Sequence, residues 1–316
     1  MENVKQPLIV ITGPTASGKT AVSIELCKRI GGEIISADSM QLYRGMDIGT
    51  AKPDLQERQG IRHHMIDVLE PDGYATASQY GQMAKQTICD IVQRGIFPVV
   101  CGGTGLYIDA LTRPMKFSAP GDESMREELK AIAAKPDGRK ELHGILAQCD
   151  PAAAEKLHEN DVRRVVRAIE SYRLTGKTQA ELAEDDAGRE GDYREILFAP
   201  DWPRDVLYSR INMRVDAMIR AGLIDEVKSL LTKGLAPDST AMQAIGYKEI
   251  VQALNSRCTM DAAIDNIKQA SRNYAKRQLT WLRRDGRVRF ISAQDKTPAQ
   301  FAEEMIGICR KEGILP

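Results

Sequence analysis

Short aliphatic runs alternate with amphipathic segments along the first 115 or so residues. The runs at residues 8–12, 33–37 and 96–101 have the branched, apolar composition of buried strands, and the more polar stretch at 62–68 is predicted to be a further strand. Apolar residues recur at helical spacing over 21–30, which ends at Gly31-Gly32, and over 78–95, with Ser78 as the expected cap. This alternation predicts an α/β fold with a parallel, doubly wound sheet.

The pattern changes at about Pro120. Helical periodicity then continues without an aliphatic run, and it predicts helices over 122–134, 139–148, 151–157 and 161–175. A strand is predicted again at 193–199. We therefore expect an all-helical insertion at residues 120–191 and a core made of residues 1–119 and 192–316.

The last third of the chain is predicted to be mostly helical, over 204–221, 223–233, 239–255 and 261–284. The final helix carries Lys268, Arg272 and Lys276 four residues apart, so their charges share one face. Such a basic stripe is typical of a nucleic-acid partner, although solvated helix faces often carry similar charges.

The first aliphatic run leads directly into Gly13-Pro14-Thr15-Ala16-Ser17-Gly18-Lys19-Thr20, which fits the pattern G-x-x-x-x-G-K-[ST] of P-loop proteins. The two glycines let the backbone N–H groups turn inward, where the helix N-terminus and Lys19 add positive charge. The Thr20 hydroxyl can bind Mg²⁺. All fixed positions and both flanking elements are present, so we predict a diphosphate or triphosphate site in a P-loop NTPase-like core.

A carboxylate follows the second predicted strand, in Asp38-Ser39-Met40-Gln41. Open α/β sheets place their chemistry at this edge. The strand at 96–101 ends in Gly-Gly-Thr and lacks the Mg²⁺-binding acid of motor and switch NTPases. Asp38 suits a small-molecule or nucleoside kinase, as the base for an attacking hydroxyl, and equally a transferase with a diphosphate leaving group. It could also be a helix cap or an outer-shell Mg²⁺ partner.

The composition of the chain indicates which partners and protein classes are not expected. Lys and Arg number 44, as do Asp and Glu, so the net charge gives no general attraction to nucleic acid or membrane. Six cysteines are scattered singly, as in reduced cytosolic proteins, and no run approaches membrane-spanning length. An RNA-binding GTPase or ATPase module would want an N-K-x-D motif, which we do not find. We expect a monomer in the cytoplasm, with no membrane partner.

Seven blocks of sequence favour one of these classes, the transferase, because they resemble a known family. They occupy residues 13–20, 35–43, 46–53, 102–107, 160–168, 243–248 and 276–283. Together they resemble the bacterial tRNA dimethylallyltransferases, also called tRNA isopentenyltransferases. The resemblance spans nearly the whole chain, and the later blocks in this order are specific to the family. One departure is Arg163, where many relatives carry Gln.

The resemblance implies transfer of a dimethylallyl group from dimethylallyl diphosphate to the exocyclic N6 amine of the tRNA adenosine 3′ to the anticodon, releasing diphosphate. Mg²⁺ on Thr20 would be the cofactor. Asp38 would be the general base and Thr104 would face the adenosine, while Lys19 and Arg214 would stabilise the departing diphosphate. The implied diphosphate-binding residues are Gly13, Pro14, Thr15, Ala16, Ser17, Gly18, Lys19, Thr20 and Arg214.

The resemblance also implies that the helical insertion clasps the anticodon stem-loop. The implied tRNA-binding residues are Asp38, Ser39, Met40, Gln41, Thr104, Arg126, Arg163, Arg164, Val165, Val166, Arg167, Gln243, Gly246, Tyr247 and Lys248. Read from spacing alone, Arg163 and Arg167 share a helix face that could equally be a solvated one, and Arg214 could be a surface salt-bridge partner.

Overall fold

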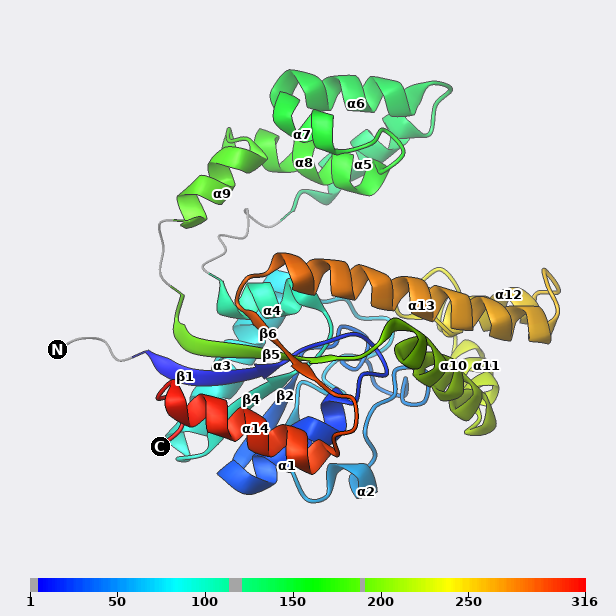
Figure 1. Cartoon of the computed structure of the whole chain (residues 1–316). Coiled ribbons are helices and arrows are strands. Elements are labelled where there is room, and N and C mark those ends of the chain that lie inside the picture. Colours follow the sequence, from blue (N-terminus) through cyan, green and yellow to red (C-terminus); the bar gives the residue numbers. More distant parts are fainter. Residues whose placement is uncertain (1–4, 114–120, 188–190) are drawn as a thin grey trace. The chain divides into compact units, whose positions relative to one another are not determined.

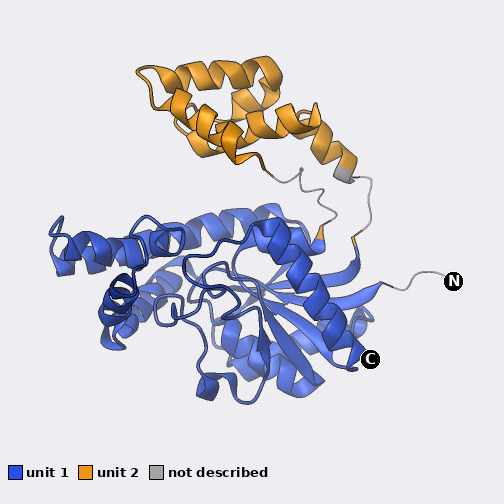
Figure 2. Cartoon of the chain, turned by 180° about the vertical axis from the view of Figure 1, so that it is seen from behind, with its two compact units in different colours: residues 1–112, 192–316 blue, residues 113–191 orange. Residues whose placement is uncertain are grey.

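A parallel sheet of six strands organises the larger of two units in the computed structural model (Figures 1 and 2). The described residues are 5–113, 121–187 and 191–316. Unit 1 comprises residues 1–112 and 192–316, and unit 2 comprises residues 113–191. The strand order is β3-β2-β4-β1-β5-β6, with β1 at Gln6–Ile11, β2 at Gly32–Ser36, β3 at His63–His64, β4 at Phe97–Cys101, β5 at Tyr193–Asp201 and β6 at Val288–Ser292.

Helices cover both faces of this sheet (Figure 1). On one face lie α1 (Lys19–Ile30) and α14 (Pro298–Lys311), and on the other lie α3 (Ala77–Gln93) and α4 (Gly105–Thr112). Successive side chains of a strand point to opposite faces, so Ile9 and Ile11 pack in the first core while Leu8 and Val10 pack in the second. Burial on both faces explains why β1 is a continuous aliphatic run.

A third core of unit 1 lies among its later helices. The elements there are α10 (Arg204–Arg220), α11 (Leu223–Thr232), the 3₁₀ helix η1 (Ala241–Gln243), α12 (Tyr247–Leu254) and α13 (Met260–Arg284). Val227, Tyr247 and Ile267 are buried in it, together with Tyr43 and Met46 from the segment after β2. This packing brings the later helices against the carboxyl-end side of the sheet. A short helix, α2 (Leu55–Arg58), also follows β2.

Unit 2 is helical throughout its described residues. It contains α5 (Glu123–Ala133), α6 (Gly138–Cys149), α7 (Pro151–Lys156), α8 (Val162–Thr175) and α9 (Gln179–Ala187). Leu129, Leu142, Leu146 and Ile169 are fully buried in a core of its own. None of the helices described in either unit combines the length and apolar character needed to cross a bilayer.

The predicted fold class is confirmed, and four local predictions were wrong or incomplete. The strand expected at 62–68 has only two residues, because Met65 and Asp67 take positive φ angles of 59° and 57°, which interrupt a ladder. The helix expected at 239–255 divides because Gly246 has φ 100°. Helix α3 is capped by Thr76 and not Ser78. The unpredicted elements are α2, α4, α9, β6 and α14. The boundary expected at 119–120 lies outside the described residues.

Candidate active site

The P-loop connects β1 to α1 with the backbone that its pattern predicts. Gly13 has φ 141° and Gly18 has φ 91°, which only glycine adopts without strain. Helix α1 starts at Lys19 directly after this turn. The unsatisfied N–H groups of its first turn and its positive dipole end therefore face the carboxyl edge of the sheet, as an anion site requires.

Two cations line the pocket beside this loop. Lys19 Nζ donates to the Pro14 carbonyl at 2.7 Å, and Arg214 Nη1 of α10 donates to Thr15 Oγ1 at 3.4 Å. Burial lowers the pKa of Lys19 to about 8, and it also lowers the pKa of Arg214, against the opposing charge of Asp38. Within the described residues neither cation forms an ion pair with a carboxylate, so both remain available to an anionic ligand.

Residues distant in sequence hold the outer side of the loop. Trp202 Nε1 donates to the Ser17 carbonyl at 3.0 Å, and Arg210 Nε donates to the Ala16 carbonyl at 2.9 Å. The Arg210 guanidinium also lies 4.4 Å from the centre of the Trp202 ring, within the range of a cation–π contact. These donors engage carbonyl oxygens of the loop and so occupy none of its N–H groups.

Asp38 and Thr104 lie next to each other at the ends of β2 and β4. Asp38 lines the same pocket as Lys19, and its Oδ1 accepts the Met40 N–H at 2.9 Å within a turn, so it is not a helix cap. Thr104 Oγ1 accepts the Ser39 N–H at 3.1 Å, and its own N–H donates to the Ala37 carbonyl at 3.1 Å. The structure therefore places the predicted base and its predicted neighbour together.

Helix α13 adds two pocket residues that sequence reasoning missed, Tyr274 and Gln278. The Tyr274 side chain lies beside Thr104, and burial, with the nearby charge of Asp38, raises the pKa of Tyr274 to about 12. Gln278 belongs to the block at 276–283 that carried the resemblance. Its place in that block was the available signal, but no local pattern could have shown what it contacts.

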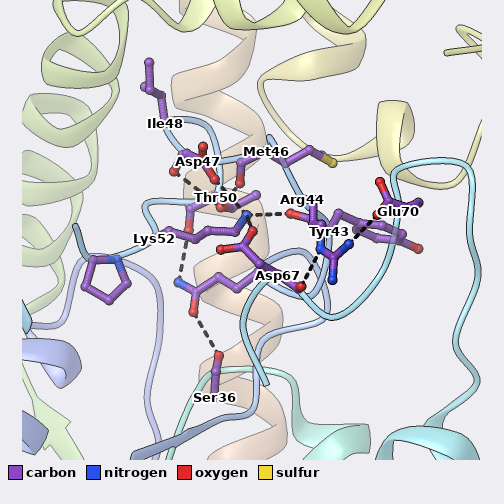
Figure 3. Close-up of polar contacts among 12 residues, drawn as sticks. Ser36, Tyr43, Arg44, Met46, Asp47, Ile48, Thr50, Lys52, Asp67 and Glu70 are labelled. Atoms are coloured by element: carbon purple, nitrogen blue, oxygen red, sulfur yellow. Dashed lines mark hydrogen bonds and ion pairs between the residues drawn. The ribbon is translucent and has the colours of Figure 1, made fainter. Parts of the chain in front are cut away.

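The segment after Asp38 contributes Gln41, Thr50 and Pro53 to the pocket lining, and Figure 3 shows polar contacts within this segment. Ser36 Oγ donates to Gln41 Oε1 at 2.8 Å, and Gln41 Nε2 donates to the Thr50 carbonyl at 3.3 Å. Lys52 is only 4 % exposed and forms ion pairs with Asp47 at 2.8 Å and Asp67 at 2.6 Å. Gln41 was predicted to bind tRNA, but both ends of its amide are engaged in holding this segment.

Glu226 of α11 anchors the same segment from outside the pocket. Its carboxylate accepts the N–H groups of Asp47, Ile48 and Gly49 at 2.9, 2.7 and 3.2 Å. It also accepts the Tyr247 hydroxyl at 2.6 Å, and the Tyr247 ring is fully buried. Tyr247 was predicted to bind tRNA, and that stays a prediction; the structure shows that its ring packs in the core of unit 1.

Comparisons with known proteins agree with this geometry. The family model described as IPP transferase matches residues 41–285. The chain belongs to the IPP transferase family. It is 44% identical to the tRNA dimethylallyltransferase of Pelotomaculum thermopropionicum over 99% of both chains. It is 49% identical to that of Shouchella clausii, over 88% of this chain and 89% of the relative.

Solved structures give the same assignment. The tRNA isopentenylpyrophosphate transferase of Bacillus halodurans superposes with a TM-score of 0.72 at 40% identity, over 98% of both chains. A eukaryotic dimethylallyltransferase described as acting on tRNA superposes with a TM-score of 0.84 at 29% identity, over 98% of this chain and 80% of that one. Both proteins are named as prenyl transferases and neither as a kinase. The IPP transferase match starts at residue 41 and therefore does not include the P-loop. The similarities over the whole chain do include it.

The residues of unit 2 that were predicted to bind tRNA differ in how exposed they are. Val165 and Val166 are buried in the helical core, and their predicted role in binding tRNA stays a prediction. Arg126 and Arg167 pair with the fully buried Glu170 at 2.8 and 2.6 Å. Arg163, Arg164 and Arg167 are all exposed; Arg164 lies 3.5 Å from Asp161, and Arg163 has no ion pair within the described residues.

The predicted tRNA-binding residues of unit 1 also differ in how exposed they are. Gln243 is exposed, Lys248 is half-buried beside Glu249 at 3.6 Å, Gly246 is buried, and Ser39 and Met40 are partly exposed.

The basic stripe of α13 is shorter than its sequence suggests. Lys268 pairs with Asp216 at 2.6 Å, and Arg272 donates to Asn212 Oδ1 at 2.6 Å, both on α10.

The pocket fits the Mg²⁺ that was expected. The Thr20 hydroxyl and the Asp38 carboxylate line it together, and no group of three or more His, Cys, Asp or Glu side chains forms a metal cluster among the described residues. Mg²⁺ is commonly bound by one or two protein groups while substrate phosphates and waters complete its octahedron. An all-protein cage is therefore not needed here, and Thr20 is the residue that would hold the ion.

Proposed function

We propose that this protein transfers the dimethylallyl group of dimethylallyl diphosphate to N6 of the adenosine 3′ to the anticodon of tRNAs, giving isopentenyladenosine and diphosphate. One observation carries the proposal: the cradle with Lys19 and Arg214 opens into the same pocket as Asp38. The names of relatives 44% and 49% identical supply the chemistry, since both are tRNA dimethylallyltransferases.

The diphosphate is the leaving group in this reaction. As the bond between carbon and oxygen breaks, negative charge grows on the oxygen that departs. The first-turn N–H groups of α1, Lys19 and Arg214 converge where that charge develops, in a pocket where burial has already lowered both pKa values. Preorganised donors in such a site stabilise the transition state more than they would in water. Thr20 would hold Mg²⁺, which supplies further charge neutralisation at the diphosphate.

The acceptor is an aromatic amine, which is a poor nucleophile. Asp38 takes the proton that N6 loses as the new carbon–nitrogen bond forms. Thr104 lies beside it, fixed by the Ser39 N–H and by its own N–H on the Ala37 carbonyl, and orients the adenosine. The base must leave its stack to reach this pocket, and an unpaired loop nucleotide does so at the lowest cost.

Binding of the anticodon stem-loop is assigned to the polar candidates that keep exposed surface. These are Arg163, Arg164 and Arg167 in unit 2, and Gln243 with the partly exposed Ser39 and Lys248 in unit 1. All six cysteines are unpaired, which fits a reducing compartment, and we place the reaction in the cytoplasm.

A direct assay tests the proposal. The protein is incubated with unmodified anticodon stem-loop RNA, Mg²⁺ and labelled dimethylallyl diphosphate, without ATP. Label should appear on the RNA, on the adenosine 3′ to the anticodon, with one diphosphate released per label. ATP hydrolysis without RNA labelling would instead support a kinase or an ATPase module and would overturn the proposal.

A further inference from the structure

One face of α13 follows the turn after β4 residue by residue. The turn comprises residues 103–105, and each contact pairs one residue of the helix with one of the turn: Tyr274 with Thr104, Gln278 with Gly103, and Trp281 with Gly105. Residues 274, 278 and 281 are four and three apart, so they share a helix face. The last contact is so close that a Cβ on Gly105 would lie 2.5 Å from the indole ring.

Gln278 differs from its two neighbours because it reaches in two directions. Its Nε2 donates to the Gly103 carbonyl at 2.8 Å, while its Oε1 accepts the Thr15 N–H of the P-loop at 2.9 Å. The side chain is 8 % exposed, and a Cβ on Gly103 would lie 2.3 Å from Nε2. The missing side chain at position 103 is thus what lets the amide approach, and both ends of that amide are fixed.

These two hydrogen bonds connect the two halves of the site. Thr15 belongs to the diphosphate cradle, and Gly103 precedes Thr104, which faces the adenosine under the proposed function. We propose that Gln278 is a positioning residue that sets the distance between the reacting carbon of the donor and the attacking amine. It acts through Thr15 and Gly103, and the inference rests on the proposed function.

Each half keeps other supports when Gln278 is removed. The loop retains the hydrogen bonds from Trp202 and Arg210, and Thr104 retains the Ala37 carbonyl. Affinity for donor and RNA, measured separately, should therefore change little. Transfer should fall, because a misplacement of about 1 Å between reacting groups can cost roughly 10²-fold in rate.

Misalignment also leaves the donor open to a competing reaction. When the carbon–oxygen bond breaks without the amine in place, water can attack the same carbon. The products are dimethylallyl alcohol, diphosphate and a proton. The ratio of diphosphate released to RNA labelled therefore reports alignment, and it does not depend on what fraction of the protein is active. A variant that is merely less stable lowers both rates and leaves this ratio unchanged.

The test variant is Gln278→Met, which keeps the approximate shape of the side chain and removes both hydrogen bonds. We expect the single-turnover transfer rate to fall by roughly 10- to 100-fold, the separate Kd values for donor and RNA to stay within about threefold, and the ratio of diphosphate to labelled RNA to rise. Gln93→Met, the same change at an exposed position near the end of α3, should match the wild type in all four measurements.

A second variant disrupts the contact between Gln278 and Gly103 by changing the glycine. Gly103→Ala places a methyl group where the Gln278 amide lies, so it should reproduce the same pattern even if Gln278→Met fails to fold. A normal transfer rate and ratio in the folded variants would overturn the inference, as would a lowered rate at an unchanged ratio. If the wild-type protein itself does not label RNA, the proposed function fails and the inference with it, which is a separate outcome.

Discussion

The cations of the donor pocket and those of unit 2 have different partners. In the pocket, Lys19 donates to a carbonyl and Arg214 to a hydroxyl. In unit 2, Arg126 and Arg167 both pair with Glu170, whose side chain is completely buried. A carbonyl or hydroxyl partner does not neutralise a cation, whereas a carboxylate does. The comparison indicates that pocket charges serve an anionic ligand, while this arginine pair mainly stabilises its own unit.

The largest effect should come from Asp38, the carboxylate that the pocket cations leave unpaired. Asp38→Ala should lower the transfer rate by roughly 10²- to 10⁴-fold, the range for a lost general base, while donor and RNA still bind. Single-turnover labelling of stem-loop RNA measures the rate. Asp72→Ala removes a carboxylate from an exposed loop and is the matched control. Near-normal transfer by Asp38→Ala would mean that the base lies elsewhere.

The first half of this comparison could be predicted from sequence, because the P-loop is one continuous stretch of eight residues. Its glycines, Lys19 and Thr20 specify a turn whose geometry hardly depends on the rest of the chain. Gln278 was missed because its hydrogen bond to Thr15 joins positions 263 residues apart, and no periodicity records such a pairing. The burial of Val165 and Tyr247 could not be predicted for a related reason: resemblance transfers a role to a position, but only packing shows which side chains are buried.

Glu170 should affect stability where Asp38 affects chemistry. Breaking a buried ion pair by removing one partner costs about 3–5 kcal/mol, and solvent reaching Arg126 and Arg167, which are 31% and 45% exposed, reduces this. We expect Glu170→Gln to lower the free energy of unfolding by about 2 kcal/mol, measured by chemical denaturation. Glu123→Gln, which removes the exposed partner of Arg126, should cost much less. An effect on donor binding with unchanged stability would contradict the comparison.

The Glu170 effect should also depend on pH. Burial acts to raise the pKa of Glu170, but the hydrogen bonds from Arg167 and Arg126 outweigh it, and the net pKa is lowered. A carboxyl group with a lowered folded-state pKa contributes its stabilisation above the unfolded pKa and loses it as the pH falls through the folded one. The stability difference between wild type and Glu170→Gln should therefore be full at neutral pH and shrink in acid.

The charge of Lys19 can be tested through the pH dependence of donor binding. Its pKa of about 8 means that the free protein loses this charge as the pH rises above that value. A diphosphate favours the protonated form, so the donor Kd should rise by about tenfold per pH unit above pH 8 and be unaffected by Lys19 below it. Calorimetric titration with the donor measures this. Lys19→Met should bind weakly and show no such rise, and an equally steep rise in that variant would assign the titration to another group.

The smallest effect tests the same distinction on one helix. Lys268 of α13 pairs with Asp216, whereas Lys276, two turns later, is exposed and has no carboxylate partner among the described residues. A lysine that already neutralises a carboxylate releases no counterion from RNA, because its charge is satisfied before binding. Lys276→Ala should therefore lower the slope of log K against log salt by about 0.7–0.9, which corresponds to one lost phosphate contact. Lys268→Ala should leave that slope unchanged and lower stability slightly instead. Equal slope changes in both variants would show that pairing with Asp216 does not withhold Lys268 from the RNA.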